Sequence, residues 1–127
     1  MDKPHIIFTC LGNICRSPMA ELILKQLRPD LVSRITSAAM TDNTAGKEMN
    51  SGAITCLWGR GIACDPYRKA IHYDDLAPRT GIEIRIDLAD VISDPYHAGD
   101  FERTYEEIIE LLRESGLIKG YSTKYLN

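Results

Sequence analysis

The residue types best suited to covalent chemistry lie together near the start of the chain. Cys10 and Arg16 are separated by five residues that include Gly12 and Asn13. A thiolate is a strong nucleophile, and a guanidinium is a planar fork that can hold two phosphate oxygens. A loop of this size that runs into a helix can also direct several backbone N–H groups at an anion. The stretch therefore predicts a phosphate site at which Cys10 attacks phosphorus.

Such a positive environment favours the thiolate form of Cys10 at neutral pH. Taken alone, Cys10 is more often a small buried strand residue and Arg16 a solvated surface charge, so a bare match of this spacing is weak. Gly12 supports the phosphate site because glycine tolerates the strained dihedrals of such a loop. The predicted phosphate-binding residues are Leu11, Gly12, Asn13, Ile14, Cys15, Arg16 and Ser17.

The elements that flank this loop are those with which an α/β fold builds an anion site. Residues 5–9 are a β-branched and aromatic run, which predicts a buried strand. Ser17 and Pro18 predict the start of a helix, with Ser17 as its N-cap, and Pro29 ends that helix. An anion site belongs at the carboxyl end of a strand, so the context favours the phosphate site over the two separate structural roles.

The rest of the chain continues the alternation of strands and helices. A strand is predicted over 34–38, a loop over 41–47 and a helix from Asn50 or Ser51 to Gly61. A strand with one polar face is predicted over 82–86 and a turn at Asp94 and Pro95. The last predicted helix begins at Asp100 and ends with a C-cap at Gly116. Residues 62–80 show no clear period, and residues 117–127 are assigned to no element. This order predicts an α/β fold of three layers: a small, mostly parallel sheet of three to four strands, helices on both faces and the phosphate loop after strand one.

Length and composition predict one cytoplasmic domain over residues 1–127. Fifteen Lys and Arg residues against eighteen Asp and Glu residues give a net charge of −3, which argues against a nucleic-acid partner. No apolar run predicts a membrane span, and no secretory leader is recognisable. No metal or other cofactor is predicted, because the histidines stand apart from one another and no Cys-x-x-Cys pair occurs among Cys10, Cys15, Cys56 and Cys64.

A thiolate that attacks a phosphoester needs a partner that donates a proton to the leaving oxygen. Asp94 is the candidate, since Pro95 restricts the direction of its carboxyl group. From spacing alone Asp94 is no better than Asp87, Asp90 or Asp100, and a simple Asp-Pro turn is the commoner structure.

Residues 7–21, Ile-Phe-Thr-Cys-Leu-Gly-Asn-Ile-Cys-Arg-Ser-Pro-Met-Ala-Glu, resemble the phosphate loop of the low-molecular-weight protein-tyrosine phosphatases. Asp94-Pro95-Tyr96, followed by residues 100–105, is similar to the general-acid loop and last helix of that family. The resemblance implies that Cys10 is the nucleophile, Arg16 the phosphate clamp and Asp94 the general acid and then base, without a metal. It also implies a cysteinyl-phosphate intermediate.

The same resemblance gives supporting roles to other residues. Ser17 would hydrogen-bond the Cys10 sulfur, and Asn13 would hold the loop with support from Ser37. Cys15 matches a cysteine that can pair reversibly with the nucleophile, and a role as a small buried residue is equally compatible with its position.

Three departures from the family pattern bear on specificity and assembly. Asn43 stands where an aromatic residue usually walls the substrate groove, which leaves Tyr96 as the main wall, and Tyr67 replaces a histidine that supports the loop asparagine. Residues 77–90 are too few for the usual strand, helix and further strand, so residues 82–86 are expected to flank strand one directly. The barer sheet edge that results favours a homodimer.

These features predict a hydrolase that acts on phosphotyrosine in proteins or on small aryl phosphates, with inorganic phosphate or sulfate able to occupy the loop. One alternative is a thiol-dependent arsenate reductase that uses Cys56 and Cys64, for which packing is the commoner role. The other is a phosphate-binding module without catalysis.

Overall fold

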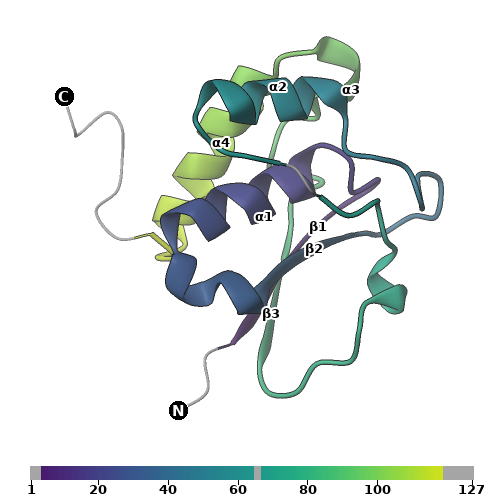
Figure 1. Cartoon of the computed structure of the whole chain (residues 1–127), viewed down its shortest axis with the longest axis vertical. Coiled ribbons are helices and arrows are strands. Elements are labelled where there is room, and N and C mark those ends of the chain that lie inside the picture. Colours follow the sequence, from purple (N-terminus) through teal and green to yellow (C-terminus); the bar gives the residue numbers. More distant parts are fainter. Residues whose placement is uncertain (1–3, 65–66, 119–127) are drawn as a thin grey trace.

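The computed structural model describes residues 4–64 and 67–118 (Figure 1). Its sheet has three parallel strands in the order β2-β1-β3, where β1 is His5–Cys10, β2 is Ile35–Ala39 and β3 is Glu83–Asp87. The central strand β1 is buried on both faces, as its nearly continuous apolar sequence requires, with Ile7 and Phe8 fully buried. Its last residue, Cys10, therefore lies at the carboxyl edge of the sheet between two neighbouring strands.

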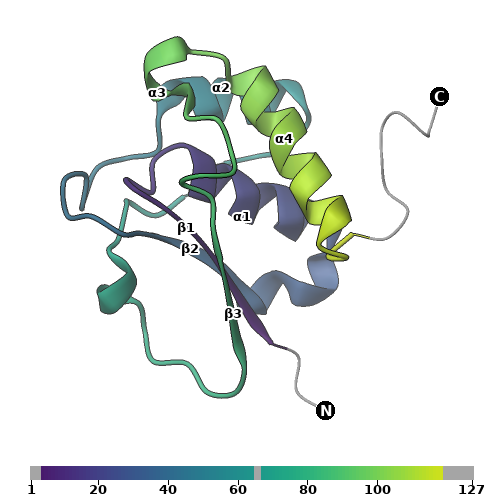
Figure 2. The same cartoon turned by 180° about the vertical axis from the view of Figure 1, so that it is seen from behind.

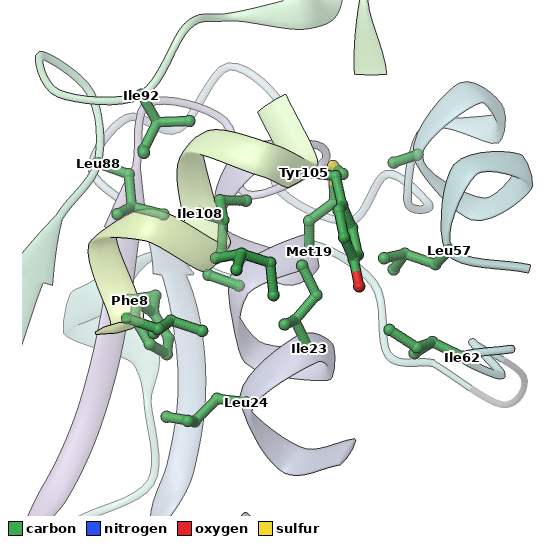
Figure 3. Close-up of a cluster of buried hydrophobic side chains, with 14 of the residues drawn as sticks. Phe8, Met19, Ile23, Leu24, Leu57, Ile62, Leu88, Ile92, Tyr105 and Ile108 are labelled. Carbon is green, nitrogen blue, oxygen red and sulfur yellow. The ribbon is translucent and has the colours of Figure 1, made fainter. Parts of the chain in front are cut away.

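One face of the sheet packs against α-helices. Helices α1 (Arg16–Leu27), α2 (Ser51–Gly59) and α4 (Phe101–Glu114) share a single apolar cluster with Ile6, Phe8 and Cys10 of β1. Figure 3 shows Phe8 below α4, with Leu24 and Ile108 among the labelled side chains nearest to it. This packing fixes α1 against the sheet and thereby fixes the loop that joins β1 to α1.

The opposite face has a thinner cover. The connection between β2 and β3 contains the 3-10 helix η2 (Tyr73–Asp75), and Arg85 of β3 lies 5.1 Å from the ring centroid of Tyr73. Arg85 pairs in register with Ile7, so Tyr73 covers the face that carries Ile7. The expected small parallel sheet with helical cover and a loop after strand one is confirmed, and in the described residues the helical element on this face is the 3-10 helix η2.

Two local expectations at helix starts are wrong. Helix α1 begins at Arg16 with Cys15 at the N-cap position, and Ser17 is not its cap. The Ser17 hydroxyl instead contacts the side chains of Cys10 and Asn13. Asp94 and Pro95 form more than a simple turn: Asp94 is the N-cap of the short helix α3 (Pro95–Ala98) and accepts a hydrogen bond from the Tyr96 N–H.

The other sequence-based boundaries hold to within about two residues, the usual uncertainty of such assignments. Asn50 caps α2, Asp100 caps α4, and Gly61 and Gly116 follow helix ends with positive φ angles of 78° and 80°. A further 3-10 helix, η1, spans Pro29–Arg34. Strand β3 flanks β1 directly, as the short 77–90 segment implied. Of the final segment, residues 119–127 lie outside the described residues.

In residues 4–64 and 67–118 no helix is both long and apolar enough to cross a membrane. The same residues contain no group of three or more His, Cys, Asp or Glu side chains arranged to hold a metal ion.

Candidate active site

A cavity of about 340 Å³ opens at the carboxyl edge of the sheet. It brings together the predicted nucleophile, clamp and acid, Cys10, Arg16 and Asp94, together with the two predicted groove residues, Asn43 and Tyr96. The remaining lining residues are Leu11, Gly12, Asn13, Ile14, Cys15, Thr41 and Thr44. Of the predicted phosphate-binding residues, Ser17 alone does not line this cavity, and it is fully buried behind the loop.

The Cys10 sulfur lies among hydrogen-bond donors. The backbone N–H groups of Asn13 and Ser17 point at Sγ with N···S distances of 3.3 and 3.4 Å, and the Ser17 Oγ lies 3.0 Å from Sγ. Ser17 Oγ accepts a hydrogen bond from Asn13 Nδ2 at 2.8 Å, which leaves its hydroxyl hydrogen to point at the sulfur. The sulfur thus lies at the centre of a ring of donors at the start of the loop.

Asn13 holds the loop in a conformation that most residues avoid. Its φ is 56°, and it is the only residue other than glycine with positive φ in the described part of the chain. The Nδ2 group donates to Ser17 Oγ and Ser37 Oγ, and Oδ1 accepts from the Ile71 N–H and from Arg68 Nη1. Because every polar group of this buried amide is occupied, the surroundings fix the left-handed backbone, which otherwise costs about 1–2 kcal/mol.

A buried carboxylate anchors the support behind Asn13. Glu21 Oε1 accepts hydrogen bonds from the hydroxyls of Ser37 at 2.7 Å and Tyr67 at 2.8 Å, and Oε2 accepts from Lys25 Nζ at 2.7 Å. Ser37 thereby takes the supporting position that was expected of it. Tyr67 reaches Ser37 and Glu21 rather than Asn13, so the expectation that Tyr67 replaces the asparagine's histidine partner is only indirectly met. Arg68 makes the direct contact with Asn13.

The segment after β2 turns the peptide groups of the loop so that their N–H ends face the cavity. The N–H of Met40 donates to the Cys10 carbonyl at 2.9 Å, and Thr41 donates through both its N–H and its hydroxyl to the Leu11 carbonyl. The Thr44 hydroxyl donates to the Gly12 carbonyl. In a trans peptide the N–H points to the opposite side from the carbonyl. Because this segment holds the carbonyls of residues 10–12, the N–H groups of residues 11–13 point away from it and toward the cavity.

Gly12 suits this close approach. A Cβ atom at position 12 would lie 3.0 Å from the Thr44 Oγ1 atom, closer than side chains normally pack. A side chain here would therefore require the Thr44 side chain, which donates to the Gly12 carbonyl, to shift by a few tenths of an ångström.

Arg16 joins the loop to a segment far along the chain. Its Nη1 donates to the carbonyls of Ala89 at 2.7 Å and Ile92 at 3.2 Å, and its Nη2 lies 3.5 Å from Asp94 Oδ2. The residue is 4% exposed, so these carbonyls fix the plane of the guanidinium at the cavity floor. A fixed planar fork is suited to two oxygens of one phosphate group.

The acid side of the cavity rests on α4. The Glu107 carboxylate accepts from both the N–H and the hydroxyl of Ser93, and the Thr104 hydroxyl donates to the Ser93 carbonyl at 3.1 Å. Asp94 follows directly and is half-exposed, with Oδ1 held by the Tyr96 N–H. Its Oδ2 therefore faces Arg16 and the cavity, where an arriving leaving group would pass.

The mouth of the cavity is partly apolar. Tyr96 and Leu11 are 56% and 51% exposed, unusually high fractions for large hydrophobic side chains. Asn43 is exposed at the same mouth and provides an amide in place of a second aromatic wall. The arrangement fits one flat apolar group beside Tyr96.

Three of the four cysteines, Cys15, Cys56 and Cys64, have raised pKa values. Burial, with the negative charges of Asp94 and Cys10, raises the pKa of Cys15 to about 12. Burial also raises the pKa of Cys56 to about 12, with a further contribution from Glu102, and burial raises the pKa of Cys64. Both Cys56 and Cys64 lie in the core cluster rather than in the cavity, as expected from packing.

The raised pKa values of Cys15, Cys56 and Cys64 predict selective alkylation. At pH 7.5 we expect iodoacetate to modify Cys10 first, because the other three thiols are protonated well below their raised pKa values and react as thiols only slowly. Cys15 should become reactive only as the pH approaches 12. Mass spectrometry of tryptic peptides measures the order, and added inorganic phosphate should slow the reaction at Cys10. Equal rates at Cys10 and Cys15 at pH 7.5 would contradict the assignment.

Sequence reasoning missed several residues that shape the site. Glu21, Arg68, Thr41 and Thr44 were given no role, and neither were the carbonyls of Ala89 and Ile92. Glu21 carried one usable signal, because it is a carboxylate four residues after Ser17, on the same helix face, with Lys25 a further four residues on. The others carry no local signal, since their partners are distant in sequence.

Fold and loop together place the chain among the α/β proteins in which a cysteine thiol ends the first strand and the next loop directs backbone N–H groups at its sulfur. The family model described as "Low molecular weight phosphotyrosine protein phosphatase" matches residues 5–79. Because this match spans more than half of the 127 residues, the chain belongs to that family. The matched range includes Cys10 to Ser17 and ends before Asp94.

Individual relatives agree with this assignment. The chain is 38% identical over 76 residues to a low molecular weight phosphotyrosine protein phosphatase of Sus scrofa, a match that covers 57% of this chain and 48% of the relative. It is similar to the crystal structure of SP-PTP, a low molecular weight protein tyrosine phosphatase from Streptococcus pyogenes. That comparison has a TM-score of 0.69 and 25% identity and covers 98% and 97% of the two chains.

An arsenate reductase from Archaeoglobus fulgidus shares the fold, with a TM-score of 0.63 and 18% identity over 87% of this chain and 97% of that one. The matched stretch spans about half the length of the curated relatives, 48%, 49% and 45% for three of them.

Proposed function

We propose that this protein hydrolyses phosphomonoesters, with phosphotyrosine in proteins or small aryl phosphates as its substrates. One observation carries the proposal: Cys10 Sγ receives two backbone N–H groups at the floor of a cavity that also holds Arg16 and Asp94. Membership of the phosphatase family supports the same reaction.

In the first step Cys10 Sγ attacks phosphorus and the ester oxygen leaves. The loop N–H groups and the Arg16 fork bind the non-bridging oxygens, whose charge they stabilise through the transition state. Asp94, at the cavity wall, donates a proton to the leaving oxygen. The products of this step are a free phenol and a phosphate covalently bound to Cys10.

In the second step Asp94, now a carboxylate, accepts a proton from a water molecule that attacks the cysteinyl phosphate. The Cys10 thiolate leaves, and the hydroxyl of Ser17, 3.0 Å from the sulfur, stabilises its charge. Inorganic phosphate is released. Because the same loop binds the product, inorganic phosphate is expected to inhibit competitively.

The shape of the cavity favours aryl esters. Cys10 is 2% exposed, so the phosphate of an ester reaches the sulfur only when the group that carries it is long enough to span the cavity. A phenyl ring has this reach, and its face can lie against Tyr96 at the mouth. With Asn43 opposite, the ring has one aromatic wall, which favours tolerance among aryl groups over tight selection of one.

Replacing Asp94 with asparagine should slow turnover in a way that depends on the leaving group. For phenyl phosphate, whose phenolate is a poor leaving group, we expect kcat/KM, which reports the step in which the ester oxygen leaves, to fall about 10²–10⁴-fold, the usual contribution of a general acid. For p-nitrophenyl phosphate the fall should be smaller, because p-nitrophenolate needs less protonation. Steady-state rates for both esters measure the difference. Equal losses for both would remove Asp94 from the role of acid.

The same assays separate the proposal from its two alternatives. A phosphate-binding module would bind tungstate without turnover of p-nitrophenyl phosphate or a phosphotyrosyl peptide. An arsenate reductase would consume arsenate with a dithiol reductant and would lose that activity in Cys56→Ala and Cys64→Ala. The Cys56 and Cys64 side chains lie in the core cluster, which supports the hydrolase over the reductase.

A further inference from the structure

Strand β3 presents a free edge and exposed apolar side chains at the margin of the sheet. It is an outer strand of the β2-β1-β3 order, and no other strand in residues 4–64 or 67–118 pairs with its far side (Figure 2). Ile82 is 70% exposed and Ile84 is 40% exposed. A free strand edge with exposed isoleucine side chains is a template for pairing with another chain.

The hydrogen bonds to β1 show which backbone groups remain free. The carbonyl of Ile82 accepts from the His5 N–H at 2.8 Å, and the N–H of Leu88 donates to the Thr9 carbonyl at 2.7 Å. Successive residues of a strand point their backbone groups to alternate sides. The even-numbered residues 82–88 therefore face β1, and Glu83, Arg85 and Asp87 direct their N–H and carbonyl groups outward.

We propose that β3 pairs antiparallel with β3 of a second copy of this chain, about a two-fold axis at Ile84. In this register Glu83 lies opposite Arg85 of the second copy and Arg85 lies opposite its Glu83. These are pairs of residues with outward backbone groups, as antiparallel hydrogen bonding requires. Each dimer thus gains two opposite-charge cross-strand pairs.

Neighbouring registers do not match in charge. An axis at Arg85 places Arg85 opposite Arg85 and Glu83 opposite Asp87, and an axis at Glu83 places Glu83 opposite Glu83. Like charges directly opposite destabilise a strand pair. An axis at Ile86 also joins opposite charges, Arg85 with Asp87, but β3 ends at Asp87, and this axis places Ile84 opposite Leu88, which is fully buried. Charge and the extent of the strand together therefore select the axis at Ile84.

The same axis also joins the exposed isoleucines. Ile84 lies opposite Ile84 of the second copy, and Ile82 lies opposite its Ile86. Ile84 and Ile86 pair in register with Ile6 and Phe8 of β1, so the contact extends the apolar face that α1 and α4 cover. The charged pairs occupy the other face, where Tyr73 contacts Glu83 and Arg85 and restrains both side chains.

This assembly does not depend on the proposed hydrolysis. The two β3 strands run in opposite directions, so the carboxyl edges of the two sheets, with their cavities, lie at opposite ends of the dimer. Each chain keeps a complete site, and the interface can be tested without an activity assay.

Two single charge reversals and their mixture test the register. Glu83→Arg alone places two arginines opposite each other at each contact, and Arg85→Glu alone places two glutamates there, so each variant should dimerise at least about tenfold more weakly than the unmodified chain. When the two variants are mixed, both contacts again join opposite charges. We expect a heterodimer with an affinity near that of the unmodified homodimer.

Sedimentation velocity over a range of concentrations measures these affinities, and a thermal transition for each variant establishes that it is folded. Lys47→Glu, an exposed charge reversal of the same size as Arg85→Glu, is the control and should dimerise normally. An unmodified chain that stays monomeric at the highest concentration would overturn the proposal. So would single variants that dimerise normally, or folded variants that fail to associate when mixed.

Discussion

Replacing Cys10 with serine is expected to abolish turnover of p-nitrophenyl phosphate and to leave phosphate binding in place. A serine hydroxyl is not ionised at neutral pH, so the attacking group loses its charge, and we expect kcat to fall about 10⁴-fold or more. The N–H groups of Asn13 and Ser17 can donate to a hydroxyl oxygen as they do to Sγ, so the loop should keep its shape.

Steady-state kinetics measure the loss, and calorimetric titration with tungstate measures binding to the same variant. Cys56→Ser is the matched control, because it makes the same substitution at a thiol that lies in the core cluster and not in the cavity. We expect this control to retain turnover. Turnover in Cys10→Ser within a factor of about ten of the unmodified chain would rule out a covalent cysteine mechanism.

Replacing Arg16 with lysine should cost about a thousandfold in kcat/KM, although the charge is kept. An ammonium group binds one oxygen at a time, whereas the guanidinium holds two in fixed geometry and stabilises the transition state. Lysine also cannot reproduce the paired bonds to the carbonyls of Ala89 and Ile92. Buried carbonyls without partners cost about 1–3 kcal/mol, so the free energy of unfolding should fall as well.

The two effects of this substitution are separable. Urea denaturation gives the change in stability, and kcat, KM and the inhibition constant for inorganic phosphate give the change at the site. Arg60→Lys, which alters an exposed arginine paired with Glu102 and Glu106 and away from the cavity, should keep kcat/KM. If Arg16→Lys retained full kcat/KM while losing stability, Arg16 would be a structural residue only.

The phosphate loop was predictable because its signals are local. The apolar run of β1, the glycine, and the cysteine and arginine all fall within twelve residues of one another in the sequence, and each has a preference that acts over a few positions. The three-stranded sheet was predictable because residues 77–90 are too few to hold a strand, a helix and a further strand. The helix start did not follow: Ser17 is a good cap by propensity, but its hydroxyl bonds Cys10 and Asn13, and tertiary contacts outweigh a capping preference of about 1 kcal/mol.

The supporting contacts were not predictable for a different reason. Carbonyl groups carry no sequence signature, and any residue at positions 89 and 92 offers one to Arg16. Arg68 lies in a segment without periodicity, and its contact with Asn13 exists because a bridge between Ala39 and His72 brings that segment beside β2. Such contacts depend on the complete fold.

The reach of Arg16 orders the assembly of the site in time. Its partners Ala89, Ile92 and Asp94 lie 73, 76 and 78 positions further along the chain. A ribosome releases the cysteine loop early, and β1 with α1 can form from nearby contacts. Arg16 lacks these partners until the segment from Ala89 to α4 has emerged and α4 has docked. Contacts of long sequence separation form late in folding. The proposed nucleophile is thus synthesised well before Arg16 has its partners, and under the proposed mechanism turnover begins only after α4 has docked.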